Sequence, residues 1–135
     1  AASGGRMAGV PGVTVAALTR EFGSRPADLL VAIGPCISAG RYEVGGDVRE
    51  RFVAAGFSDD QRGRWFSDGV RAAHWQFNGW QAAIDQLESA GVPAAQIHLS
   101  ALCTASHPGL LCSYRREGKG AGRIIAAIRC ASPRP

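Results

Sequence analysis

The chain has 135 residues, of which 46% are hydrophobic and 19% charged, so it is long enough for one domain with a real core and is not extensively disordered. Its formal net charge is +4, but the arginines are scattered and no basic helix or aromatic-plus-basic platform stands out, which argues against a nucleic-acid partner. No apolar run of about 18 residues appears, so we expect no membrane partner and a cytoplasmic location.

Apolar residues recur at helical spacing in three places. This periodicity predicts helices over residues 13–22, 47–55 and 78–90. A glycine follows each of these segments closely and is expected to end the helix by adopting a left-handed backbone conformation.

Two other segments have the character of strands. Residues 29–33 form a continuous apolar run, which predicts a central strand buried on both faces. Residues 97–103 alternate well enough to predict a second strand. The polar and charged stretch 57–73, with one apolar insertion, is expected to be a surface excursion.

The most distinctive stretch is 113–123, which holds four cations and three glycines between apolar runs at 110–112 and 124–128. This pattern predicts a strand, a cationic Gly-rich turn and a second strand. Glycine allows close backbone approach to a ligand, and the guanidinium of arginine suits carboxylate or phosphate, so the stretch indicates an anion site. The alternative is a solvated hairpin tip whose charges keep a sheet edge soluble.

Four cysteines are present, at positions 36, 103, 112 and 130, without a CxxC motif and without close pairing to the three histidines. A zinc knuckle is therefore excluded, and free thiols in a reducing compartment are expected. Cys36 follows the predicted strand, where a thiol either lines a pocket or acts as a small buried hydrophobe. Glu43 either faces a site or is an exposed carboxylate.

Several of these segments together resemble one known family. They are 29–37 with 42–45, then Leu102-Cys103-Thr104, then 113–118 with 122–123. In order and spacing they are similar to the YfiH family, also called the laccase-domain or multicopper polyphenol oxidase family. The resemblance covers about residues 7–128.

This resemblance implies an α+β fold in which mixed β-sheet layers are sandwiched by helices. It also implies a purine nucleoside phosphorylase that cleaves adenosine or inosine with phosphate, and some members are described as deaminating adenosine. An older assignment of the family is copper-dependent oxidation of phenols.

The residues favour phosphorolysis, which needs donors that hold an anionic nucleophile. Arg115, Arg116 and Arg123 suit the phosphate, and the resemblance places Gly34, Glu43 and Cys103 near the substrate pocket; for Cys103 a buried structural thiol is the alternative. A laccase-type oxidase needs several coppers held by many histidines, and three scattered histidines do not supply them.

The chain also departs from the family. The resemblance implies that full-length members bind zinc, with copper claimed for some. Two histidines and a cysteine that lie upstream are the implied ligands, and the last of these histidines stands in a His-Ala-Gly-Trp-Arg-Gly motif. Residues 1–6 contain no histidine or tryptophan. We therefore expect a linker or truncation remnant over 1–6, the C-terminal portion of a YfiH-like domain over 7–130 and a tail over 131–135, with no metal ligands in this chain.

Such a portion of a domain would leave a sheet edge and apolar surface uncovered, which predicts a homodimer or a domain swap. It also leaves a non-catalytic alternative, in which the chain is an inactive fragment or a binding module. Nucleoside and phosphate are the small-molecule partners implied by the resemblance.

Overall fold

The computed structural model describes residues 9–128. The expected linker at 1–6, the tail at 131–135 and Cys130 lie outside the described residues. In chain order the helices and strands are α2 (Val10–Phe22), β1 (Val31–Ile33), β2 (Glu43–Gly45), α3 (Gly46–Ala54), α4 (Asp59–Trp65), β3 (Phe66–Asp68), β4 (His74–Phe77), α5 (Gly79–Ser89), β5 (Ile97–Leu99) and α6 (Tyr114–Glu117). The predicted mixed α+β class is confirmed.

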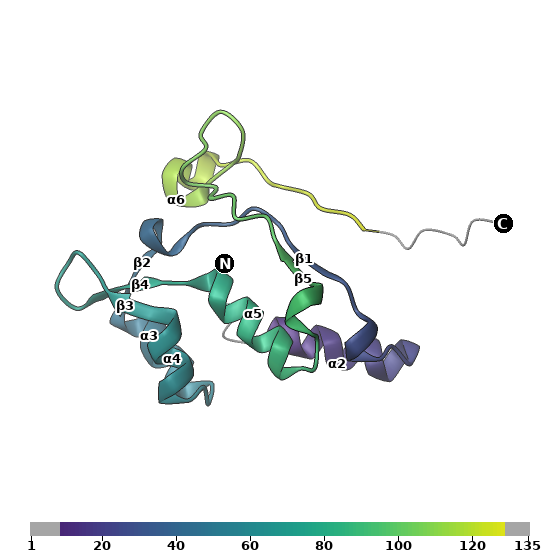
Figure 1. The fold of residues 1–135 in the computed structure, drawn as a ribbon. Coiled ribbons are helices and arrows are strands. Elements are labelled where there is room, and N and C mark those ends of the chain that lie inside the picture. Colours follow the sequence, from purple (N-terminus) through teal and green to yellow (C-terminus); the bar gives the residue numbers. More distant parts are fainter. Residues whose placement is uncertain (1–8, 129–135) are drawn as a thin grey trace.

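The strands form two small sheets. Strands β1 and β5 pair in parallel, and β2, β4 and β3 form an antiparallel sheet in that order. Figure 1 shows α2 and α5 on one side of β1 and β5, α3 and α4 below β2 to β4, and α6 on the opposite side. Among residues 9–128, none of the helices combines the length and the apolar character needed to cross a membrane.

An aromatic core holds the antiparallel sheet against α3 and α4. Phe52, Trp65 and Phe77 are fully buried, and their rings pack with centroid separations of 5.1 Å for Phe52–Phe77 and 5.9 Å for Phe52–Trp65. The Asp85 carboxylate of α5 accepts a 2.8 Å hydrogen bond from the Trp65 indole N–H, which ties α5 to the end of α4. Fully burying each of these rings removes a large apolar area from water.

A smaller aliphatic core lies under the parallel pair. Val15 of α2, Leu87 of α5 and Val92 are buried together, with apolar residues of β1 and β5 packed against them. Helix α5 therefore contributes to both cores and connects the two sheets.

The three predicted helices are confirmed as α2, α3 and α5, although α2 begins at Val10. Gly23 ends α2 with φ of 65°, and its N–H donates to carbonyl oxygens of the last turn. Gly56 and Gly91 also have positive φ just beyond α3 and α5. Asn78 begins α5 by accepting a hydrogen bond from the Gln81 N–H, as an N-cap side chain does.

The predicted hairpin at 110–128 is wrong. Residues 114–117 form α6, because the Ser113 carbonyl accepts hydrogen bonds from the Arg116 and Glu117 N–H groups and the Glu117 carboxylate accepts one from the Ser113 N–H. Residues 121–128 run without pairing to any described strand, and Ile125 is 91% exposed. An apolar run becomes a strand only when a neighbouring edge is available.

The prediction of a central strand buried on both faces at 29–33 is also wrong. Strand β1 covers only Val31–Ile33 and, within the described residues, pairs on one edge with β5. Leu30 remains 66% exposed. The strand itself is correctly located, but the described chain does not supply a neighbour for its second edge or a cover for its second face.

The polar stretch 57–73 is not a simple surface excursion. Ser58 and Gln61 form a reciprocal capping box that begins α4, and ion pairs from Arg62 to Asp59 and from Arg64 to Asp60 follow its turns. The helix delivers Trp65 into the aromatic core. Asp59, Asp60 and Arg64 lie on the solvent-exposed side of this helix, which the prediction interpreted as a loop.

Candidate anion-binding site

Two of the predicted arginines lie on α6, which bridges β2 and the turn that follows Cys103. Arg115 reaches β2, and Arg116 reaches the turn at Thr104. Neighbouring residues on this one-turn helix thus point to different parts of the fold. This separates the roles that the three predicted arginines are able to take.

Arg115 is exposed and lies on an aromatic ring. Its guanidinium carbon is 4.9 Å from the centroid of the Tyr42 ring, and its Nη1 donates a 2.7 Å hydrogen bond to the carbonyl oxygen of Glu43. Within the described residues its other guanidinium N–H groups have no hydrogen-bond partner. The face of the ring attracts this cation, and its other guanidinium N–H groups are left for a ligand.

Arg116 is occupied by the protein itself. Its Nη1 donates to the carbonyl oxygen of Thr104 at 2.9 Å, and its Nη2 donates to the carbonyl oxygen of Leu111 at 2.8 Å and to the Glu117 carboxylate. These bonds close the loop between the Cys103 turn and α6. In this conformation Arg116 therefore positions α6 and has few donors left for a ligand.

Arg123 and Gly34 lie apart from these contacts. The Arg123 Nη1 donates to the carbonyl oxygens of its neighbours Ala121 and Gly122 at 2.9 and 3.1 Å. Gly34 follows β1, and a methyl group at its Cα would meet no atom within 4 Å. The structure thus shows open space at Gly34 but no contact between it and the arginines.

Glu43 is engaged with the loop between β3 and β4. Its Oε1 accepts hydrogen bonds from the Val70 N–H at 2.7 Å and the Arg71 N–H at 2.9 Å, and its Oε2 accepts one from the Arg71 Nε at 2.6 Å. The backbone N–H and the guanidinium of Arg71, with the Val70 N–H, hold the pKa of Glu43 below its ordinary value. Its side chain is only 17% exposed, so it is neither a free carboxylate nor an open ligand.

Cys103 is buried and its sulfur accepts hydrogen bonds. The Ser38 N–H lies 3.3 Å from the Cys103 Sγ. Burial opposes ionisation of this thiol, but hydrogen bonds from the Ser106 and Ser38 side chains and from the Ser38 and Ala105 N–H groups outweigh it and lower its pKa to about 6. Cys103 and Cys112 form no disulfide among the described residues.

The sequence interpretation missed the residues that support this site. Tyr42 provides the ring beneath Arg115, and Arg71 neutralises Glu43. Ser38 and Ser106 supply donors to Cys103. Only Tyr42 had a local signal, since it lies beside Glu43; the others depend on contacts between distant parts of the chain.

The described residues do not fit a zinc or copper site. Among residues 9–128 there is no group of three or more His, Cys, Asp or Glu side chains placed to hold a metal ion. His74 Nδ1 lies 2.8 Å from the Ala72 carbonyl oxygen and His107 Nδ1 lies 2.8 Å from the Cys103 carbonyl oxygen, while His98 is on β5.

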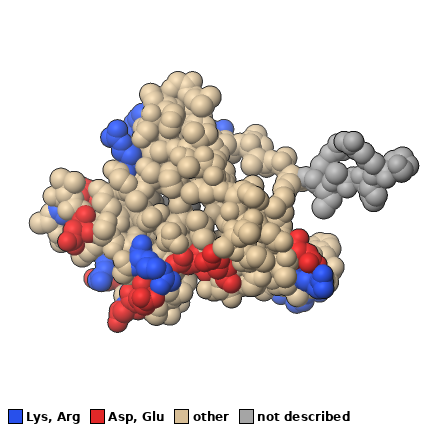
Figure 2. All heavy atoms as spheres, viewed as in Figure 1, with Lys and Arg blue, Asp and Glu red and all other residues tan. Residues whose placement is uncertain are grey.

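Charge is distributed unevenly over the surface. Figure 2 shows acidic and basic side chains interleaved along the lower part of the molecule, where α3 and α4 lie, whereas the middle of this face is mostly uncharged. Ion pairs join several of the charged residues of α3 and α4, such as Arg51 with Asp47 and Arg64 with Asp60. Arg115 has no carboxylate partner among the described residues, so its positive charge is left unneutralised.

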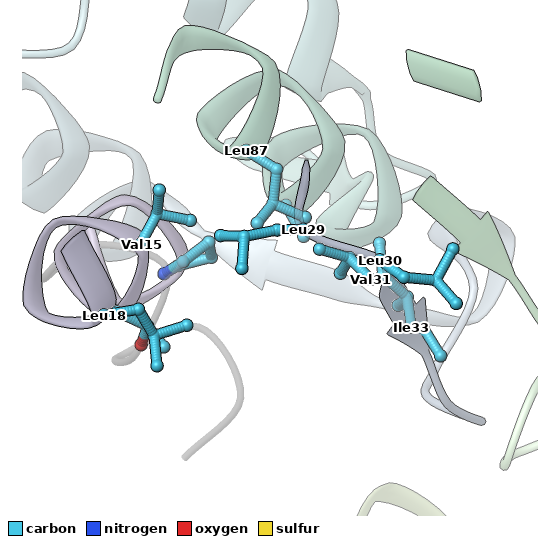
Figure 3. A pocket seen from close by; sticks show the side chains of 11 residues that line it. Val15, Leu18, Leu29, Leu30, Val31, Ile33 and Leu87 are labelled. Atoms are coloured by element: carbon cyan, nitrogen blue, oxygen red, sulfur yellow. The ribbon is translucent and has the colours of Figure 1, made fainter. Parts of the chain in front are cut away.

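The larger hollow in this structure lies away from the arginines. It has a volume of about 360 Å³ and is bounded by α2, β1 and α5. Figure 3 shows Val15 and Leu18 from α2, Leu87 from α5 and the apolar residues from Leu29 to Ile33 around it. Among the described residues its lining is almost entirely apolar.

Comparison with known proteins places the chain in a family. The profile of the family described as multi-copper polyphenol oxidoreductase laccase matches residues 2–131. This chain belongs to that family. The predicted YfiH resemblance is thereby confirmed, and we use the name YfiH family below.

The curated relatives carry a different activity in their names. A protein named purine nucleoside phosphorylase from Bacteroides thetaiotaomicron is 35% identical over 115 residues, which is 85% of this chain and 42% of that protein. Purine nucleoside phosphorylase YlmD from Bacillus subtilis is 32% identical over 110 residues, which is 82% of this chain and 38% of that protein. The oxidase description of the family and the phosphorylase names of these relatives thus disagree.

Solved structures agree with the fold. The crystal structure of YfiH from Bacillus licheniformis has a TM-score of 0.75 at 28% identity and is matched over 83% of this chain and 41% of that chain. YlmD from Geobacillus stearothermophilus has a TM-score of 0.70 at 26% identity, over 83% of this chain and 40% of that chain. The chain therefore spans about two fifths of the length of the YfiH-family proteins that it matches.

Proposed function

We propose that this chain provides the anion-holding side of a purine nucleoside phosphorylase site, with a purine nucleoside and phosphate as substrates. The observation that carries the proposal is the exposed guanidinium of Arg115, stacked on Tyr42 and unpaired with any described carboxylate. The phosphorylase names of relatives at about a third identity support the substrate class.

In this reaction a phosphate oxygen attacks the anomeric carbon of the ribose, and the bond from that carbon to the purine nitrogen breaks. The electron pair of the broken bond leaves with the purine. Arg115 would hold the phosphate through its outward N–H groups, because a guanidinium offers two parallel donors to an oxyanion. A neutralised Glu43 nearby would not repel the incoming phosphate.

The remaining predicted residues take supporting roles in the proposal. Arg116 positions α6 through its bonds to Thr104 and Leu111. Open space at Gly34 would admit substrate, and Cys103, which forms a parallel β-bridge with Cys36, would border the pocket. Arg123, which bonds to its own neighbours, is proposed to order the segment after α6 and serves as the matched control.

The test is titration calorimetry of inorganic phosphate with the 135-residue chain, followed by chromatography of adenosine and inosine incubated with and without phosphate. We expect Arg115→Ala to weaken phosphate binding by tenfold or more, since a charge-assisted bidentate contact contributes about 1.5–3 kcal/mol. Arg123→Ala should bind as the unmodified chain does. Equal phosphate binding by both variants contradicts the proposal.

The chromatography also separates the finer possibilities. Phosphate-dependent release of adenine or hypoxanthine supports phosphorolysis, and conversion of adenosine to inosine reports deamination. Phosphate binding without turnover indicates that the other three fifths of a full-length relative is needed for catalysis. Oxygen uptake on a phenol, without nucleoside turnover, would favour the oxidase description instead.

We also propose that the chain associates with a second copy through the apolar hollow. Leu30 at its rim is 66% exposed, and apolar side chains of α2, β1 and α5 line it. Apolar side chains gathered over two elements favour an interface more than isolated exposed residues do. The molar mass in solution tests this proposal.

A further inference from the structure

Cys36 and Cys103 lie opposite each other beyond the ends of β1 and β5. The Cys36 N–H donates to the Leu102 carbonyl oxygen at 3.2 Å, and the Thr104 N–H donates to the Cys36 carbonyl oxygen at 3.3 Å. These two bonds form a parallel bridge that pairs the two cysteines. Residues directly opposite in a sheet carry their side chains on the same face, so the bridge brings the two cysteine side chains to one face of the sheet.

The pairing depends on one extra residue in the second segment. The register of β1 and β5, if continued, would bring Leu102 opposite Cys36, but the bridge pairs Cys36 with Cys103. Ala101 lies just before, with φ of 54°, in the left-handed region that non-glycine residues rarely adopt. This bulge exchanges a leucine for a second cysteine at the position facing Cys36.

The backbone spacing allows a bond between the two sulfurs. Neighbouring strands lie about 4.8 Å apart. Disulfides join residues whose Cα atoms are about 4.4–6.8 Å apart, so the bridge already has a suitable separation.

The surroundings also prepare the two sulfurs for reaction. Hydrogen bonds from Ser38, Ala105 and Ser106 favour the thiolate of Cys103, which is the nucleophilic form. The Trp80 indole N–H donates to the Cys36 sulfur. Cys103 is 6% exposed while Cys36 is half-buried, so the pair reaches the surface on the Cys36 side.

We propose that Cys36 and Cys103 form a reversible redox-modification site that peroxide converts into an intramolecular disulfide. The Cys103 thiolate attacks an oxygen of hydrogen peroxide, the O–O bond breaks, and the released hydroxide takes up a proton to become water. Cys103 is then a sulfenic acid. The Cys36 sulfur attacks the Cys103 sulfur, the S–O bond breaks, and a second water leaves with the Cys36 proton. A dithiol reductant reverses the step.

Peptide mapping by mass spectrometry tests the proposal on the unmodified chain. Brief peroxide treatment should join the peptides containing Cys36 and Cys103, with a mass decrease of about 2 Da per chain that dithiothreitol reverses. The rate should rise with pH around a midpoint near 6, where Cys103 ionises. The same treatment in concentrated urea should lose the preference for this pair, because the preference comes from the folded bridge.

Variants separate this site from ordinary thiol oxidation. Cys112→Ser is the matched control and should form the disulfide at the unmodified rate. Cys36→Ser should stop at the sulfenic acid, which dimedone traps on Cys103, and circular dichroism verifies that this variant is folded. The proposal is overturned if the unmodified folded chain keeps Cys36 and Cys103 reduced while Cys112 oxidises, or pairs Cys103 with another cysteine instead. No nucleoside is present, so the outcome is independent of the proposed function.

Discussion

The guanidinium carbon of Arg115 lies 4.9 Å from the centroid of the Tyr42 ring, while its Nη1 donates to the Glu43 carbonyl oxygen at 2.7 Å. One side chain thus attaches the short helix α6 to β2 by two contacts with consecutive residues. A helix of four residues has little stability of its own. Its position depends on such tertiary contacts, and Arg115 is one of the residues that provide them.

Replacing Arg115 with lysine separates its charge from its shape. Lysine keeps the charge but lacks the planar fork, so both the stacking on Tyr42 and bidentate phosphate binding should weaken. We expect the free energy of unfolding to fall by about 0.5–1 kcal/mol. Phosphate affinity should fall several-fold. Urea unfolding measures the loss of stability, and calorimetry measures the phosphate affinity. Arg123→Lys is the control and should change neither quantity. An unaltered phosphate affinity in Arg115→Lys would argue against Arg115 as the anion ligand.

Glu43 should make stability depend on pH in the acid range. Its pKa is lower in the folded chain than in the unfolded chain, so the folded state binds fewer protons between the two values. The stabilisation is complete above the ordinary glutamate pKa of about 4.3 and is lost as the pH falls through the lowered folded value.

Glu43→Gln should therefore be less stable than the unmodified chain near neutral pH, with the difference shrinking as the pH falls through this window. Urea midpoints measured over that range test the prediction. Glu50→Gln, on the exposed face of α3, is the control and should follow the unmodified chain. A difference that stays constant with pH would mean that the Glu43 carboxylate is not what stabilises the loop at Val70 and Arg71.

Asp85 is a buried carboxylate that joins α4 and α5. Its oxygens accept hydrogen bonds from the Trp65 indole at 2.8 Å, the Arg64 Nε at 3.0 Å and the Gln81 amide at 2.6 Å. Burial opposes its ionisation, but these donors outweigh burial and lower its pKa. Asp85→Asn should cost about 2–3 kcal/mol of unfolding free energy, because charge-assisted bonds are weakened at a buried site.

The matched control is Asp60→Asn, which removes the exposed partner of the same arginine. The Asp60 side chain is 81% exposed, whereas that of Asp85 is 8% exposed. An exposed ion pair contributes about 0–1 kcal/mol, so Asp60→Asn should be nearly neutral. Urea denaturation followed by tryptophan fluorescence compares the two variants, and equal losses would show that burial does not set the strength of the Asp85 contact.

Local sequence signals predicted the helices well, because amphipathic spacing and a following glycine are properties of the segment itself. Gly23 ends α2 with the left-handed φ that its position suggests. The prediction missed helix α4, although Ser58 and Gln61 form a capping box at its start. Most residues of α4 are charged or polar and Trp65 is its buried apolar residue, so the segment shows no apolar periodicity.

Strands were predicted less well, because a strand requires a neighbour that local sequence does not specify. Residues 124–128 are apolar enough for a strand, yet within the described chain no edge pairs with them. The arginines illustrate the same limit at the site. Sequence indicated that Arg115 and Arg116 bind an anion, but which of them is available depends on the carbonyl oxygens of Thr104 and Leu111, which reach Arg116 only in the folded chain.

Self-association should depend on the apolar hollow beside β1. Leu30→Lys places a charge at its exposed rim, and a charge buried against another apolar surface without a partner is strongly unfavourable. We expect the unmodified chain of 14.1 kDa to behave as a dimer in light scattering and Leu30→Lys to behave as a monomer. Folding should be retained, because Leu30 is 66% exposed in the single chain.

Val70→Lys provides the control for this substitution. Val70 is 91% exposed and lies in the loop between β3 and β4. Val70→Lys therefore also replaces an exposed apolar residue with lysine, but on a surface away from the hollow. If Val70→Lys also yields monomers, general charge repulsion and not the hollow governs association. If the unmodified chain is a monomer at micromolar concentration, the apolar hollow stays exposed to solvent. The proposal that a second copy covers it would then be wrong.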